Sequence, residues 1–302
     1  MQQNWQNRYA FRAACTAAWL GFACVVLPLS PLAAQTPSQP DDADELPAYL
    51  YDRGPGIATS QFGTYVEPGQ RLLYPFYEYT RTGSFEYHAS ELGSVGEEDY
   101  LGKLVEREAL LFFSYGISER FAFEVEAALQ TRATFDKAPN DPTSVPQHLT
   151  ESGLGDVEGQ LRWRWRPETA DHAEYFSFFE LVLPSQRNKL LIGTQDWEAT
   201  IGIGSLRGHP WGTLGWRVSM AYDRSDPSPS LEGGEFAIDY IKRRSEKWRW
   251  VASLEGESDE LSVIGEAQWF LNGHSFVKIN SGFGLTEKAP DFAPEIGVMF
   301  TF

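Results

Sequence analysis

Short segments in which apolar and polar residues alternate recur from about residue 70 to the C-terminus. Phe121, Phe123 and Val125, for example, alternate with Glu124 and Glu126. Successive side chains of a β-strand point to opposite faces, so this period of two predicts strands with one apolar and one polar face. No window in this part of the chain has the 3.6-residue period of an amphipathic helix.

Twelve such strands are predicted, separated by turn residues. Their expected ranges are 71–80, 103–117, 120–133, 153–167, 173–184, 196–207, 212–224, 233–244, 247–256, 261–271, 275–286 and 293–302. The connections after even-numbered strands are short, and most of those after odd-numbered strands are longer. An even strand number with unequal loops is typical of bacterial outer-membrane barrels, whose termini lie in the periplasm. The sequence therefore predicts an all-β, transmembrane, antiparallel up-and-down β-barrel.

A soluble β-sandwich would also show alternation, because its inner faces pack together. The barrel is favoured by strands long enough to cross a bilayer at a tilt and by tryptophans near the short turns, where an aromatic girdle is expected. These tryptophans are Trp163, Trp165, Trp211, Trp248 and Trp250.

The N-terminus has the pattern of an export signal. Arg8 and Arg12 precede the uncharged residues 13–29, and Ala33 and Ala34 supply the small side chains that a signal peptidase requires. We expect residues 1–34 to be a cleaved signal peptide; the alternative is a membrane anchor, for which the apolar segment is of marginal length.

Residues 35–70 form a predicted periplasmic lead-in that is partly disordered, because the first part is rich in Pro, Gln, Ser and Asp. Residues 52–56 are rich in turn formers. We interpret them as a surface turn, with a plug folded into the barrel as the alternative. The predicted domains are therefore residues 1–34, 35–70 and the barrel at 71–302.

Charge and cysteine usage narrow the function. The chain has 42 acidic and 25 basic residues and a formal net charge of −17, which excludes a basic nucleic-acid binder. Both cysteines, Cys15 and Cys24, fall in the predicted signal, so the exported chain would have none. An acidic chain without cysteine suits an oxidising bacterial envelope.

The C-terminal residues resemble a known targeting signature. Ile296, Val298, Phe300 and the final Phe302 alternate as in the last strand of Gram-negative outer-membrane β-barrels. The resemblance implies a location in the outer membrane, contact with lipid and lipopolysaccharide, and insertion by the barrel-assembly machinery. Residues 153–156, with the sequence Gly-Leu-Gly-Asp, resemble the transporter family associated with the phenol meta-cleavage pathway.

The predicted inner face carries charges of both signs. Arg162, Arg164 and Arg166 form a ladder on one strand that could guide an anionic solute, or pair with Glu124 and Glu126 across the strands. We favour pairing, since confined charges are usually paired. Further members of this solute path or salt-bridge network are Glu158, Arg217, Arg249 and Glu266.

We expect a porin-like outer-membrane channel or transporter for small organic solutes, hydrophobic or anionic, without catalysis, cofactor or metal. One alternative is a hydrolase acting from the extracellular loops through His88 with Ser84 or Ser90. The other is a structural barrel plugged by its own salt bridges.

Overall fold

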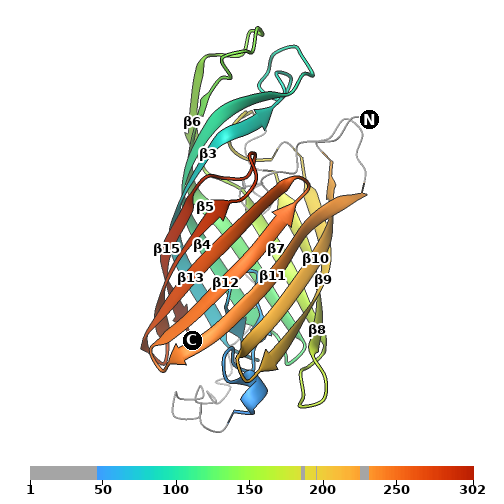
Figure 1. The fold of residues 1–302 in the computed structure, drawn as a ribbon, viewed down its shortest axis with the longest axis vertical. Helices are drawn as coiled ribbons and strands as arrows, with labels where there is room; N and C mark the ends of the chain where they lie inside the picture. Colours follow the sequence, from blue (N-terminus) through green and yellow to red (C-terminus); the bar gives the residue numbers. More distant parts are fainter. Residues whose placement is uncertain (1–45, 185–187, 195, 225–230) are drawn as a thin grey trace, which may run out of the picture.

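Antiparallel strands close into a barrel in the computed structural model, which describes residues 46–184, 188–194, 196–224 and 231–302 (Figure 1). The wall strands are β3 (Arg71–Tyr87), β4 (Tyr100–Gly116), β5 (Phe121–Asp136), β6 (His148–Gly153), β7 (Val157–Arg166), β8 (Glu174–Leu183), β9 (Glu198–His209), β10 (Gly212–Asp223), β11 (Leu231–Ser245), β12 (Trp248–Glu257), β13 (Glu260–Asn272), β14 (Ser275–Gly284) and β15 (Ala293–Thr301). The barrel closes because β3 pairs with both β4 and β15.

The wall has the predicted twelve strands within the described residues, since β6 and β7 both pair with β5 and form one interrupted strand. The predicted signal peptide lies outside the described residues. β3 continues to Tyr87, past the predicted end at residue 80, and β3 to β6 rise above the rest of the barrel at the end with the longer loops (Figure 1). We call this the long-loop end and the opposite one the short-turn end.

The two faces of the wall differ as the alternation predicts. Large apolar side chains are exposed on the outside, and the predicted girdle tryptophans are among them. Charged side chains such as Glu124, Arg162 and Lys278 are buried inside. No helix among the described residues is long and apolar enough to cross a membrane.

One part of the face assignment is wrong. Strict alternation continued from Glu124 and Glu126 predicts that Gln130 and Arg132 also lie on the inner face, but both are exposed, and Thr131 is buried instead. The pairing of β5 with β4 shifts register at this point. Such an irregularity reverses the faces of the residues that follow it, because the side-chain period is two.

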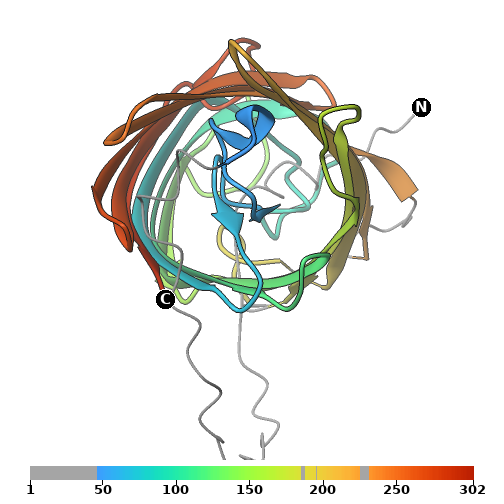
Figure 2. The same cartoon turned by 90° about the horizontal axis from the view of Figure 1, so that it is seen from below.

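Residues 46–70 begin at the mouth of the short-turn end, where the first residues lie at the level of the turns (Figure 1), and then continue into the lumen (Figure 2). This lumenal segment contains a short 3₁₀ helix (Ala48–Leu50) and a hairpin of β1 (Ile57–Ala58) and β2 (Tyr65–Val66). Ile57 and Val66 are buried in an apolar cluster with inward side chains of the wall, including Tyr74 and Phe112. The prediction of a surface turn at residues 52–56 is therefore wrong; the segment buries apolar surface by entering the lumen.

Candidate functional site

Arg53 anchors the lumenal segment at the short-turn end. The side chain is almost fully buried, and Nη2 donates to Glu174 at 2.9 Å and to Glu168 at 3.2 Å. Arg249 Nη1 donates to the carbonyl oxygen of Arg53 at 3.2 Å. A guanidinium in such a site needs both carboxylates and hydrogen bonds to offset its desolvation. These groups therefore hold the base of the segment against the wall.

Arg164, one of the predicted ladder residues, also holds the lumenal segment. Nη1 donates to the carbonyl oxygens of Pro55 at 2.7 Å and Gly56 at 3.1 Å, and Nε donates to that of Glu119 at 2.9 Å. The same side chain lies 3.5 Å from Glu174. Arg164 thus ties the segment to the turn between β4 and β5, and its donors are used in doing so.

The other two ladder residues have different surroundings. Arg162 lies 3.4 Å from Glu124 and donates to Gln160 at 2.5 Å, and its guanidinium lies over the ring of Phe178. This contact agrees with the pairing that we favoured. Arg166 does not face the lumen as predicted: it is exposed, because the pairing of β7 with β8 is irregular after Arg164.

The tip of the lumenal hairpin contacts the predicted acidic residues of β5. The backbone N–H and hydroxyl of Ser60 donate to Glu124 at 2.8 and 2.6 Å, and Gln61 Nε2 donates to Glu126 at 2.6 Å. On the opposite wall, Gln268 Nε2 donates to the carbonyl oxygen of Gly63 at 3.1 Å. Gly63 has a φ of +63°, and a Cβ there would lie 2.7 Å from a methyl carbon of Val251. The hairpin tip is therefore closely packed against the barrel wall.

The remaining predicted network residues lie inside the barrel. Arg217 contacts three carboxylates, with Nη2 at 2.5 Å from Glu235 and 2.9 Å from Glu255, and Nη1 at 3.3 Å from Asp239. Arg249 Nε donates to Gln268 at 2.7 Å.

Glu266 and Lys278 form a buried ion pair at 3.3 Å. Lys278 also lies 3.6 Å from Glu295, and it donates to Gln61 of the hairpin tip at 3.1 Å. The cation is therefore shared between the wall and the lumenal segment.

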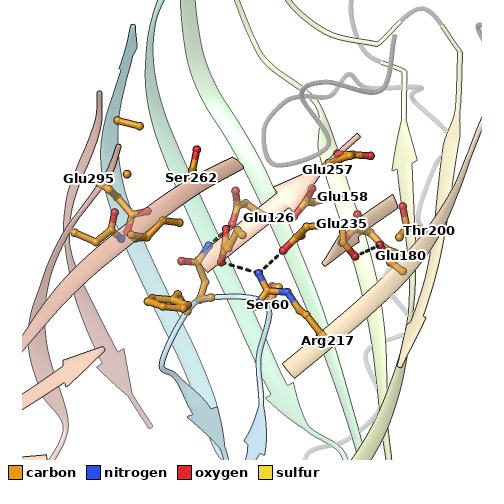
Figure 3. A pocket seen from close by; sticks show the side chains of 18 of the residues that line it. Ser60, Glu126, Glu158, Glu180, Thr200, Arg217, Glu235, Glu257, Ser262 and Glu295 are labelled. Atoms are coloured by element: carbon orange, nitrogen blue, oxygen red, sulfur yellow. Dashed lines mark hydrogen bonds and ion pairs between the residues drawn. The ribbon is translucent and has the colours of Figure 1, made fainter. Parts of the chain in front are cut away.

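A cavity of about 240 Å³ lies beyond the hairpin tip, toward the long-loop end (Figure 3). Its lining includes three basic side chains, Arg162, Arg217 and Lys278. Ten glutamates of the described part of the chain also line it: Glu78, Glu106, Glu126, Glu158, Glu180, Glu235, Glu255, Glu257, Glu260 and Glu295. The cavity wall is therefore strongly acidic, which the predicted arginine ladder did not suggest.

Several of these glutamates were missed by sequence reasoning. Glu180 follows Phe176 and Phe178 on the inner face of β8, and Glu78 follows Tyr74 and Phe76 on the inner face of β3. Aromatic side chains on the inner face hide the expected alternation of apolar and polar positions. The signal that could have found both glutamates is strict period-two counting along each strand.

The C-terminal signature residues point outward. Ile296, Phe300 and Phe302 are exposed, and Val298 is half-buried between them on β15. The tetrapeptide at residues 153–156 is the break between β6 and β7, and Asp156 accepts a hydrogen bond from the backbone N–H of Thr194 at 2.7 Å.

His88 is engaged by acids. Nε2 lies 2.5 Å from Asp99 and Nδ1 lies 3.3 Å from Glu91. Among the described residues, the His88 ring makes no contact with the hydroxyl of Ser84 or Ser90. The Ser–His pair that a hydrolase would need is therefore not assembled there. In the same part of the chain, no three His, Cys, Asp or Glu side chains converge to hold a metal ion.

No protein-family model and no curated protein matches the sequence. Similar solved structures include the translocator domain of the autotransporter NalP from Neisseria meningitidis, with 11% identity over 78% of this chain and 88% of that chain and a TM-score of 0.45. The NanC porin has 10% identity, covering 76% and 98%, with a TM-score of 0.46. The P. putida toluene transporter TodX has 7% identity, covering 85% and 98%, with a TM-score of 0.43. Similarity at this level carries no argument about a solute, and the resemblance of residues 153–156 stays a prediction.

Proposed function

We propose that the protein is an outer-membrane channel for small solutes in which residues 46–70 form a plug. The observation that carries the proposal is a cavity inside a closed barrel whose outer surface is apolar and whose lumen is charged. An apolar belt with an aromatic girdle is what a bilayer requires of a barrel, and a polar interior is what a water-filled path requires.

The proposed orientation of the barrel in the outer membrane follows from the loop lengths and the exposed tryptophans. Short turns and exposed tryptophans mark the end that we place in the periplasm, and the longer loops belong outside. Both termini are then periplasmic, and residues 1–34 act as the export signal. The expected surroundings are lipid and lipopolysaccharide, and the barrel-assembly machinery inserts the chain.

The plug is held mainly by groups that can exchange protein partners for water. Arg53, Arg164 and the hairpin tip use ion pairs and hydrogen bonds, whereas Ile57 and Val66, together with Ala58 and Tyr65, supply apolar contacts with the wall. A segment held in this way supports a channel that is closed or narrow at rest and opens when the plug shifts.

Of the two solute classes predicted, hydrophobic and anionic, the lining of the cavity favours the hydrophobic one. Arg162 and Arg164 are occupied by the wall and the plug, and the cavity carries ten glutamates, so an anionic solute has little support. Apolar surface from Phe62, Phe76 and Phe178 remains compatible with a hydrophobic part of a solute.

Single-channel conductance in planar bilayers tests the proposal. Folding of the refolded mature chain is first verified by heat-modifiable gel mobility. We expect small, stable steps from the wild type and larger or more frequent steps from Arg53→Met, which removes the buried anchor. Arg120→Met, at an exposed arginine of the short-turn end, is the matched control and should behave as wild type. Folded barrels without steps, in the wild type and Arg53→Met alike, would favour the plugged structural barrel.

A further inference from the structure

Basic side chains lie together on the outer face of the barrel, on the strands that rise above the rest of the wall. Arg107 on β4 and Arg132 on β5 are directly opposite each other, and both are exposed. Lys103 on β4 and Arg81 on β3 are exposed on the same outer face. We call these four residues the basic patch.

The patch begins where the outer surface stops being apolar. On β4, Leu111 and Phe113 occupy outward positions between Arg107 and the short-turn end. On β5, Phe123 is 41% and Leu129 is 53% exposed on the part of the strand that leads up to the patch. The patch therefore adjoins the surface that would contact the acyl chains of a bilayer.

The barrel geometry places the patch at a membrane boundary. Arg81 forms a bridge with Phe292, immediately before β15 begins at Ala293, so the wall on that side ends at this level while β3 continues. From Arg71 to Arg81, β3 advances about 34 Å along its own direction and about 26 Å along the membrane normal at a tilt of about 40°. The apolar band of an outer-membrane barrel is about 25 Å tall. The patch therefore lies at the headgroup level on the long-loop side.

The two arginines at the centre of the patch differ from the buried arginines of the lumen. Among the described residues, neither Arg107 nor Arg132 forms an ion pair with a carboxylate, and the Arg107 guanidinium lies over the ring of Tyr79 at 5.7 Å. Like charges at directly opposite positions destabilise a sheet. An anion bound between the two guanidinium groups would offset their repulsion.

Two acids near the patch do not neutralise it. Asp136 is opposite Lys103 in the pairing of β4 with β5, but its carboxylate contacts His148 at 2.8 Å. Asp291 lies 3.8 Å from Arg81, and because both side chains are about half exposed, the attraction between them is weak. These acids therefore leave the patch with a net positive charge.

We propose that the basic patch binds the phosphate groups of lipopolysaccharide in the outer leaflet. The planar guanidinium groups of Arg107 and Arg132 match the geometry of phosphate oxygens. The acyl chains of the same molecule lie on the apolar surface beside the patch, which favours an amphiphilic lipid over a soluble anion. The inference rests on the proposed orientation in the outer membrane, and it does not require an open channel.

Microscale thermophoresis of the refolded mature chain in detergent micelles tests lipid binding. The probe is diphosphoryl lipid A, and zwitterionic phosphatidylcholine and inorganic phosphate are the comparison compounds. We expect the chain to bind diphosphoryl lipid A most tightly, with an affinity that falls as salt is added, because exposed charges are screened. Equal affinity for phosphatidylcholine or for inorganic phosphate would overturn the proposal.

A double variant locates the site. Arg107→Gln with Arg132→Gln breaks no ion pair among the described residues and removes two opposed like charges, so the barrel should fold, which heat-modifiable gel mobility verifies. We expect diphosphoryl lipid A to bind about thirtyfold more weakly, equivalent to about 2 kcal/mol, as for two basic groups at an anionic membrane surface.

The matched control removes the same charge at the opposite end. Arg120 and Arg244 are exposed near the short turns, and Arg120→Gln with Arg244→Gln should leave the affinity for lipid A unchanged. Equal affinities of the wild type and the Arg107/Arg132 variant would overturn the proposal. Equal losses in both double variants would show attraction by net charge alone and would overturn it as well.

Two further measurements separate this inference from the proposed function. Lipid A binding at the patch without single-channel steps keeps the lipid site and overturns the channel, and steps without lipid A binding do the reverse. Val95 is 91% exposed in the loop after β3. We expect a membrane-impermeant maleimide to label Val95→Cys on intact cells. Absence of labelling would place the patch in the periplasmic leaflet, which lacks lipopolysaccharide, and would overturn the proposal.

Discussion

The two halves of the lumen balance charge in different ways. At the short-turn end, Arg53 meets Glu168 and Glu174, and Arg164 meets carbonyl oxygens of the plug. Toward the long-loop end, ten glutamates and three basic side chains among the described residues surround a cavity. Buried charges cost free energy unless they are paired. The pairing at the short-turn end therefore favours a lumen that is closed by the plug there. In the second half, acidic side chains outnumber basic ones around the cavity among the described residues.

Strand β7 shows how closely these roles adjoin. Arg164 holds the plug, Arg162 faces Glu124 at the plug tip, and Glu158 lines the cavity opposite Glu126. All belong to one inner face, and only their depth in the barrel differs. Alternating positions of a single strand can therefore hold the plug at one level and line the cavity at the next.

The largest effect on stability is expected in the short-turn half of the lumen, where the buried charges are paired. Glu174→Gln leaves Arg53 and Arg164 without their shared carboxylate, which should lower the free energy of unfolding by about 3–5 kcal/mol. Urea titration of the barrel in lipid vesicles measures it. Glu180→Gln on the same strand keeps an acceptor for Gln160, so its effect should stay below about 1 kcal/mol. Equal losses of unfolding free energy in the two variants would contradict the proposed difference between the two halves of the lumen.

The comparison also requires that the charged face is the inner one. Ile201 on β9 is 56% exposed on the outer surface. Ile201→Lys should cost roughly 2–4 kcal/mol if the position faces lipid near the midplane. The yield of heat-modifiable barrel in vesicles reports this cost. Normal yield would contradict the placement of this face in the membrane.

A smaller effect is expected at the plug tip. Gly63 has a left-handed backbone, and its added Cβ would approach Val251, so Gly63→Ala should cost about 1–2 kcal/mol. We expect more frequent channel openings in this variant, since the tip no longer fits. Gly69→Ala also has a positive φ but has open space around it, and it serves as the control for backbone strain alone. Identical opening frequencies in both would show that tip packing is unimportant.

The smallest effect has the opposite sign. Glu158→Gln removes a like charge opposite Glu126 and should raise the free energy of unfolding by about 0.2–1 kcal/mol. The same urea titration measures it. Destabilisation would mean that Glu158 is paired in the folded barrel, and the long-loop half would then resemble the paired half.

The strands could be predicted because their signal is local. The predicted segment 212–224 matches β10 at Gly212–Asp223, and the predicted segment 247–256 matches β12 at Trp248–Glu257. Alternation along each strand also placed Arg217 and Glu266 inside. The shift at residues 130–132 could not be predicted, since it depends on how β5 pairs with β4.

The sequence by itself determined the class of wall, its strand number and the outward position of residues such as Ile296, because period-two alternation is a property of consecutive residues. Only the tertiary structure decided that residues 46–70 occupy the lumen and that Arg164 holds them. It also brought Glu78 of β3 beside Glu295 of β15. These contacts join residues far apart in the chain, and closure of the barrel decides which of them meet.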